Sequence, residues 1–175
     1  MPMLLVWLML GLVGLAACLV VSACCVFCLF RGAQPERKRL VLPAALLAAL
    51  LLLRYGGAAL LEPAQLAWRA GMRTAFGVAI AAAFGWMARR TLRCVDDLLM
   101  GVSWTGAAVH LCAALTVLAL LVFGGISLLF GTWKDHEWNW EGQRVVVEYS
   151  GIFHATGYRY VNGLVHGEQL FEWED

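Results

Sequence analysis

Residues 3–30 read "MLLVWLMLGLVGLAACLVVSACCVFCLF", a run of 28 residues without one charged side chain. A helix needs about 20 apolar residues to cross the hydrocarbon core of a membrane. The run therefore predicts a membrane-spanning helix that begins close to the N-terminus and ends before Arg31.

Three more apolar runs follow. Residues 40–61 are interrupted only by Arg54, and residues 70–88 only by Arg73, which we expect to extend toward the lipid headgroups. The last run, residues 98–133, is too long for one span, since as a helix it would measure about 54 Å. We assign the fourth span to residues 108–130 and leave open whether Leu98 to Ala107 lies in or on the membrane. The predicted fold is an α-helical integral membrane domain of four transmembrane helices over residues 1–133.

The charges are distributed unevenly along the chain. Residues 1–133 contain ten Lys or Arg and four acidic residues, whereas residues 134–175 contain three and eight. Only 14% of all residues are charged, against about a quarter in soluble domains. The basic residues stand in small groups at the ends of apolar runs, so the pattern does not favour nucleic-acid binding. It is typical of a membrane protein with a small acidic appendage.

The basic groups also predict the orientation of the chain. Segments 31–39 and 89–97, read as loops, hold four and three basic residues, while segment 62–73 holds two. Basic loops stay in the cytoplasm. With four spans, both termini are then extracytoplasmic, in a multi-pass protein of the plasma membrane.

The N-terminus allows a second interpretation. "LAAC" at 15–18 matches the short pattern before a lipidated cysteine in bacterial secreted proteins. However, no basic residue precedes the apolar run, and twelve apolar residues follow Cys18, where a processed protein would become polar. We favour an uncleaved membrane helix. The six cysteines, among them the Cys25–Cys28 pair, lack the paired spacing of a zinc site and are read as small buried side chains.

Small residues recur four apart in the third predicted span, at Gly77, Ala81 and Gly85. This spacing lets two helix backbones approach closely, so it predicts helix packing within the chain or a homo-oligomer through this span. Arg54 and His110 are the ionisable residues placed inside spans. Such residues are costly in lipid and are functional candidates, although both stand close enough to a predicted membrane face for a structural role.

Residues 134–175 differ from everything before them. Residues 144–149 alternate, with Val145 and Val147 on one face and Arg144 and Glu148 on the other. Asn162–Gly163 is a strong signal for a hairpin turn, with positive φ expected at both positions. We predict a small antiparallel β segment of three short strands, with the acidic stretch before residue 144 as a solvated linker.

No catalytic motif occurs in the sequence, and the acidic and His residues of the tail have no spacing that fixes a metal geometry. We therefore expect no enzymatic activity, cofactor or metal. The aromatic pairs around "YRYVN" (158–162), followed by Gly163 and an acidic aromatic end, are similar to the closing segment of small uncharacterised multi-pass membrane proteins of Gram-positive bacteria. That resemblance implies a bacterial plasma membrane with the tail outside.

Two functions agree with this pattern. The first is a non-enzymatic membrane protein whose extracytoplasmic β-tail binds a protein partner, as an envelope scaffold or an immunity-type protein does. The alternative is a small oligomeric transporter or channel subunit that uses Arg54 or His110.

Overall fold

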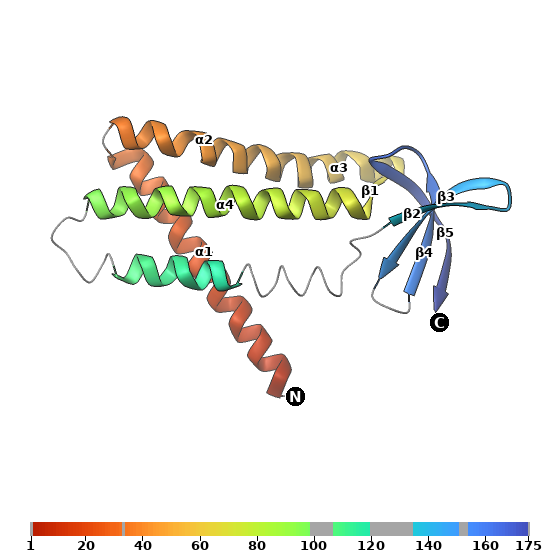
Figure 1. Ribbon diagram of the computed structural model, residues 1–175, viewed down its shortest axis with the longest axis horizontal. Coiled ribbons are helices and arrows are strands. Elements are labelled where there is room, and N and C mark those ends of the chain that lie inside the picture. The colour runs from red at the N-terminus through yellow and green to blue at the C-terminus, as the bar shows by residue number, and fades with distance from the viewer. Residues whose placement is uncertain (1, 33, 99–106, 120–134, 151–153, 175) are drawn as a thin grey trace. The chain divides into compact units, whose positions relative to one another are not determined.

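The computed structural model describes residues 2–32, 34–98, 107–119, 135–150 and 154–174 (Figure 1). The chain divides into two compact units. The helical unit comprises Met1–Ala48 and Ala81–Gly124, and the sheet unit comprises Ala49–Ile80 and Gly125–Asp175. Each unit is described separately.

Helices of different lengths make up most of the described part of residues 1–119. They are α1 (Pro2–Arg31), α2 (Gln34–Leu51), the π-helix η1 (Leu52–Gly56), α3 (Gly57–Leu61), the 3-10 helix η2 (Glu62–Ala64), α4 (Ala70–Leu98) and a helix over Ala107–Ala119. Among the residues that the structure describes, three stretches are long and apolar enough to cross a membrane: Gly11–Arg31, Arg37–Ala64 and Ala70–Asp97. They coincide with the first three predicted spans. The fourth predicted span covers residues 108–130. The helix Ala107–Ala119 contains its first part, and the remainder lies outside the described residues.

Two predicted loops are largely helical. Segment 89–97 is part of α4, which continues to Leu98, and α2 already begins at Gln34, within the predicted loop 31–39. The basic residues do not mark loops here. Arg and Leu favour helices, and segment 89–97 contains neither Gly nor Pro to end one. Pro35 stands in the first turn of α2, where a helix tolerates proline.

Small side chains hold the helical unit together. In α1 the buried residues recur every three or four positions, at Gly14, Ala17, Val21, Cys25 and Cys28. Cys25 and Cys28 share a core cluster with residues of α2 and α4, and Figure 1 shows α1 crossing these helices obliquely. A Cβ added to Gly14 would lie 2.7 Å from the Cβ of Ala119. Close backbone contact of this kind is how helices associate in lipid.

The predicted Gly77–Ala81–Gly85 stripe does not make such a contact. A Cβ added to Gly77 or to Gly85 would have no atom of the described chain within 4 Å. The buried positions of α4 lie elsewhere, at Ala70, Ala83, Met87, Ala88, Thr91, Cys94 and Val95. Packing through this stripe between two copies of the chain stays a prediction.

The sheet unit contains a five-stranded antiparallel sheet in the order β1-β5-β4-β3-β2. Its strands are β1 (Ala67–Trp68), β2 (Asp135–Trp140), β3 (Gln143–Ser150), β4 (His154–Tyr160) and β5 (Val165–Glu174). The prediction of three strands in the tail is wrong, since the tail supplies four and segment 62–69 adds a fifth. The predicted acidic linker is also wrong, because part of it forms β2.

The positive-φ hairpin turn lies at Glu141–Gly142, not at Asn162–Gly163. Glu141 has φ 50° and Gly142 φ 81°, and these two residues alone connect β2 to β3. Residues 161–164 connect β4 to β5 without a positive φ. There the Asn162 side-chain oxygen accepts hydrogen bonds from the N–H groups of Leu164 (2.8 Å) and Val165 (3.0 Å). Asn162 therefore reverses the chain with its side chain, a turn that needs no left-handed backbone.

The two faces of the sheet differ in chemistry. One carries aromatic rings of the outer strands over small residues of the central strands, with Trp140 and Phe171 4.7 Å apart and Val145, Val147 and Ala155 buried beneath. A Cβ on Gly157 would collide with the Phe171 ring. The opposite face carries Asp135, Glu137 and Glu148. It lies at the beginning of α4.

Candidate functional site

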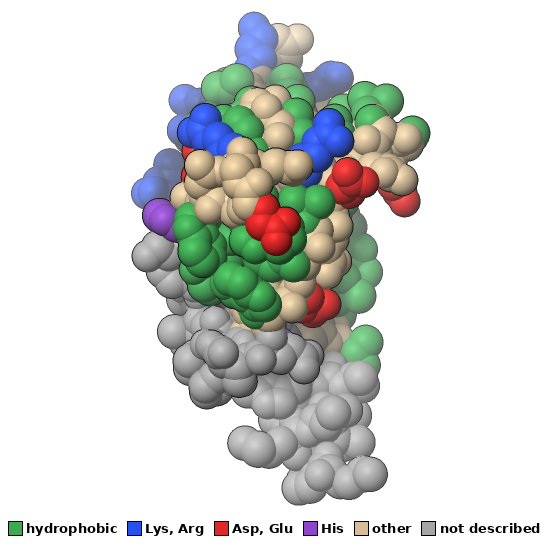
Figure 2. Space-filling view, turned by 90° about the vertical axis from the view of Figure 1, so that its right-hand side faces the viewer, with side chains coloured by type: hydrophobic (Ala, Val, Ile, Leu, Met, Phe, Trp, Pro, Cys, Tyr) green, Lys and Arg blue, Asp and Glu red, His purple; other side chains and the backbone are tan. Residues whose placement is uncertain are grey.

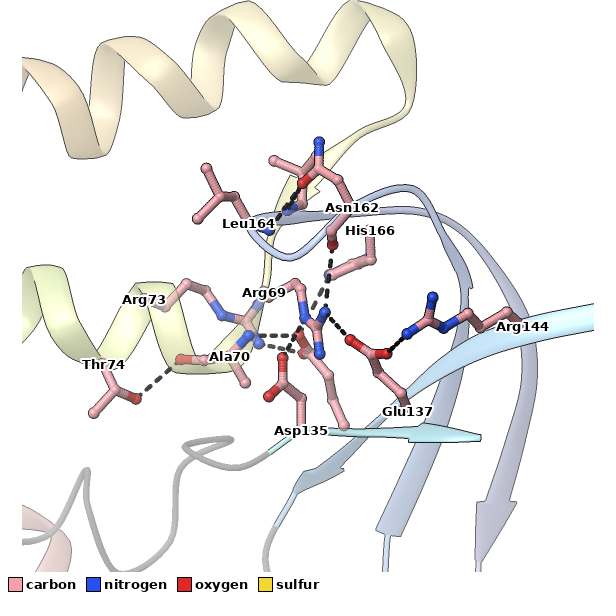
Figure 3. Close-up of polar contacts among 12 residues, drawn as sticks. Arg69, Ala70, Arg73, Thr74, Asp135, Glu137, Arg144, Asn162, Leu164 and His166 are labelled. Atoms are coloured by element: carbon pink, nitrogen blue, oxygen red, sulfur yellow. Dashed lines mark hydrogen bonds and ion pairs between the residues drawn. The ribbon is translucent and has the colours of Figure 1, made fainter. Parts of the chain in front are cut away.

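Arg69 stands immediately before α4 and joins it to the sheet. Its side chain is only 8% exposed, and its Nε donates to Asp135 Oδ2 at 2.6 Å. Its Nη1 donates to Glu137 Oε1 at 2.8 Å and to the Asn162 carbonyl at 3.3 Å (Figure 3). Asp135 and Glu137 are two apart on β2 and so share one face of the strand.

These contacts keep both partners charged. Burial opposes the charge of Arg69, but hydrogen bonds to Glu137 and Asp135 outweigh burial and raise the pKa of the guanidinium. The hydrogen bond from Arg69 lowers the pKa of Glu137 despite some desolvation, and Arg144 adds to this effect. The ion pair is therefore fully formed at neutral pH.

Glu148 of β3 is a second joint between the sheet and α4. The residue is 2% exposed, and its Oε1 accepts a hydrogen bond from the backbone N–H of Ala70 at 2.7 Å. Its Oε2 accepts one from Arg73 Nη2, one turn further along α4. The first N–H groups of a helix lack intrahelical partners and form its positive end. Glu148 thus caps α4 from a strand 78 residues away.

His166 of β5 completes this buried polar group, which we call the joint cluster (Arg69, Arg73, Asp135, Glu137, Glu148 and His166). The residue is 3% exposed, and its ring lies 4.0 Å from that of Tyr158. Its Nδ1 is 3.0 Å from the Gly167 carbonyl. Its Nε2 has no hydrogen-bond partner among the described residues and lies 3.4 Å from Glu148 Oε1.

An open cavity of about 650 Å³ adjoins the joint cluster within the sheet unit. Its helical wall includes Arg54, Ala58 and Glu62, and its sheet wall includes Tyr158 and His166. Most of the remaining lining is apolar. Of the two ionisable residues predicted in spans, Arg54 lines this cavity, whereas His110 belongs to the helical unit and lies 3.6 Å from Asp96.

The sequence prediction missed the joint cluster. The sequence places Arg69 only among loop charges and predicts that Arg73 extends toward the headgroups; in the structure Arg73 contacts Glu148. The sequence does contain one signal for a buried ion pair. Glu148 follows three valines in β3, and a carboxylate that is buried in such a strand needs a charged or hydrogen-bonding partner. Nothing local indicated that the partner stands 75 residues earlier.

The aromatic face of the sheet is the other candidate surface. Trp138 and Trp173 are 48% and 45% exposed, and their rings lie 5.7 Å apart. Figure 2 views the side of the chain where the sheet lies and shows hydrophobic side chains gathered beside acidic and basic ones.

No group of three or more His, Cys, Asp or Glu side chains that could hold a metal forms within the described ranges. No protein-family model matches the chain, and no curated protein and no solved structure is similar to it. The similarity of roughly the last 20 to 30 residues to small Gram-positive membrane proteins stays a prediction.

Proposed function

We propose that the chain is a non-enzymatic, multi-pass membrane protein whose β-sheet binds a protein partner at the membrane surface. The outward faces of its helices support the location. Large apolar side chains such as Leu19, Phe30 and Leu60 are 63%, 79% and 82% exposed. In water an apolar surface of this extent would be unstable or would bind a partner, whereas in lipid it is solvated.

The pairing of β1 with β5 supports an even number of crossings between them. β1 lies just before α4, and β5 belongs to the tail, yet Ala67 pairs with His166 and Trp68 with Val165. If α4 crosses the membrane, the chain has to cross back before Asp135 to rejoin this sheet. Four spans follow, with segment 62–69 and the tail on one side. With the basic segments in the cytoplasm, that side is extracytoplasmic.

The aromatic face carries the proposed partner binding. Exposed Trp and Tyr side chains are enriched in protein interfaces, where they supply large contact areas at low entropic cost. Trp138 and Trp173 lie on a sheet that the joint cluster fixes to α4. A rigid scaffold with a half-exposed aromatic pair is suited to binding a partner.

Site-specific photo-crosslinking tests this proposal in intact cells. A crosslinking amino acid at Trp138 or Trp173 should give one product of defined mass. The same amino acid at Asn139, exposed but on the opposite face of β2, is the matched control. Equal products from both faces, or products with lipid alone, would contradict partner binding.

One observation favours the alternative of a small oligomeric transporter or channel subunit. Arg54 lies in the π-helix η1, and π-turns in α-helices are frequent at functional sites. Solute flux into vesicles that contain the purified chain, abolished in Arg54→Gln, would support that function instead.

A further inference from the structure

Arg54 is a cation without a matching anion. The guanidinium carbon of Arg54 lies 5.6 Å from the centre of the neighbouring Tyr55 ring. No carboxylate of the described chain forms an ion pair with Arg54. By contrast, the other arginine lining the cavity, Arg73, contacts Glu148. An arginine inside an apolar helix is costly unless something neutralises it.

The acid that shares the cavity does not neutralise Arg54. Glu62 stands eight residues further along the same helical stretch, about 12 Å at the usual rise per residue.

Arg54 lies in the second half of the apolar stretch Arg37–Ala64. It precedes the end of the apolar stretch Arg37–Ala64 by ten residues, about 15 Å along the axis. An arginine side chain extends several ångströms toward the membrane surface. Beside it, Leu52 and Leu53 expose 71% and 57% of their surface and Leu60 exposes 82%. The helix thus presents a lone cation in the midst of exposed apolar side chains.

The cavity walls leave room for a headgroup. Ala58 and Ala59 on the helical wall and Gly167 on the sheet wall are small, while Tyr158 and Trp68 add aromatic surface. The Trp68 Nε1 is buried without a hydrogen-bond partner in the described chain. We propose that this cavity binds the phosphate of an anionic phospholipid, with Arg54 as the charged ligand and the acyl chains along the exposed leucines. The proposal rests on the membrane insertion inferred above.

Native mass spectrometry of the full chain tests it. The protein is released from nanodiscs of phosphatidylcholine that contain a minor share of phosphatidylglycerol. We expect wild type to retain phosphatidylglycerol selectively, and Arg54→Gln to lose roughly tenfold to a hundredfold in retention, since a hydrogen bond to a charged group is lost. Arg159→Gln is the matched control, because Arg159 is 63% exposed and pairs with Glu168 outside the cavity.

A second variant guards against misfolding of Arg54→Gln. Ala58→Phe fills the cavity without changing its charge, and it should also lose the lipid while its circular dichroism stays that of wild type. Equal retention of the two lipids by wild type, or full retention in either cavity variant, would overturn the site. Displacement by soluble glycerol phosphate as readily as by lipid would overturn the lipid assignment. A chain that does not enter nanodiscs would contradict membrane insertion itself, and the lipid site with it.

Discussion

The two units of the chain are stabilised by opposite means. In the helical unit the buried contacts come from Gly14, Ala17 and the Cys25–Cys28 cluster, and the large apolar side chains point outward. In the sheet unit the joint between strands and α4 consists of charged groups, of which Glu148 and Arg69 are almost fully buried.

The membrane insertion proposed above would account for this difference. In lipid, apolar side chains gain nothing from leaving the solvent, so helices associate through close backbone contact. At the beginning of α4 the free N–H groups and two arginines instead need anions. The sheet supplies these anions through Asp135, Glu137 and Glu148. Such a network is sensitive to the loss of one member, because the charged groups that contacted it lose a partner.

The largest effect should follow from Glu148→Gln. The variant keeps an acceptor for the Ala70 N–H but removes the negative charge that Arg73 contacts, and breaking a buried pair costs about 3 to 5 kcal/mol. Thermal unfolding in detergent, followed by tryptophan fluorescence of the sheet, should shift strongly downward.

Glu168→Gln is the matched control, since Glu168 is half exposed and lies 3.5 Å from Arg159 at the surface. It should cost less than about 1 kcal/mol. Similar losses in the two variants would mean that the joint cluster contributes no more than a surface ion pair.

The helical unit should respond to Gly14→Ala. The added methyl would lie 2.7 Å from the Ala119 Cβ, and overpacking costs about 1 to 3 kcal/mol. That cost exceeds the gain in helix propensity of about 1 kcal/mol. Helicity measured during thermal unfolding should therefore be lost at lower temperature.

Gly77→Ala gives the opposite expectation, because the same methyl finds open space on α4. It should stabilise the monomer slightly. An oligomer of the wild type that dissociates in Gly77→Ala would support self-association through the predicted stripe, and a loss of monomer stability would contradict the packing described.

Local sequence predicted much of the helical unit and less of the sheet unit. Apolar runs and Gly and Pro residues act over a few turns, so spans 3–30, 40–61 and 70–88 matched long helices. The joint cluster depends on contacts between residues 66 to 78 apart, such as Arg69 with Asp135. No periodicity encodes such a pairing, and a two-residue strand such as β1 has no pattern of its own.

The turns show a subtler limit. Asn-Gly usually marks a hairpin with positive φ, and Asn162–Gly163 does lie between two paired strands. The left-handed turn nevertheless formed at Glu141–Gly142, where a non-glycine residue takes φ 50° because β2 and β3 are paired over their whole length up to it. Tertiary pairing overrode the local preference of glutamate.

Gly142→Ala should therefore destabilise the sheet more than Gly163→Ala. A side chain at φ 81° costs about 1 to 2 kcal/mol, whereas Gly163 has open space and no positive φ. Protease sensitivity of residues 135–174 compares the two variants directly. Greater sensitivity in Gly163→Ala would restore the turn that the sequence predicted.

The smallest effect should appear on acidification. Because Arg69 lowers the pKa of Glu137 in the folded chain, the unfolded chain takes up the proton first as pH falls. The stability from this ion pair is thus complete above the ordinary glutamate pKa and is lost below about pH 4. Wild type should lose melting temperature in that range more steeply than Glu137→Gln, which has no such proton to bind. The difference between the two curves isolates Glu137 from the other acids of the joint cluster. Parallel curves would mean that Asp135 alone balances Arg69, and that the second acid of β2 adds little to the joint.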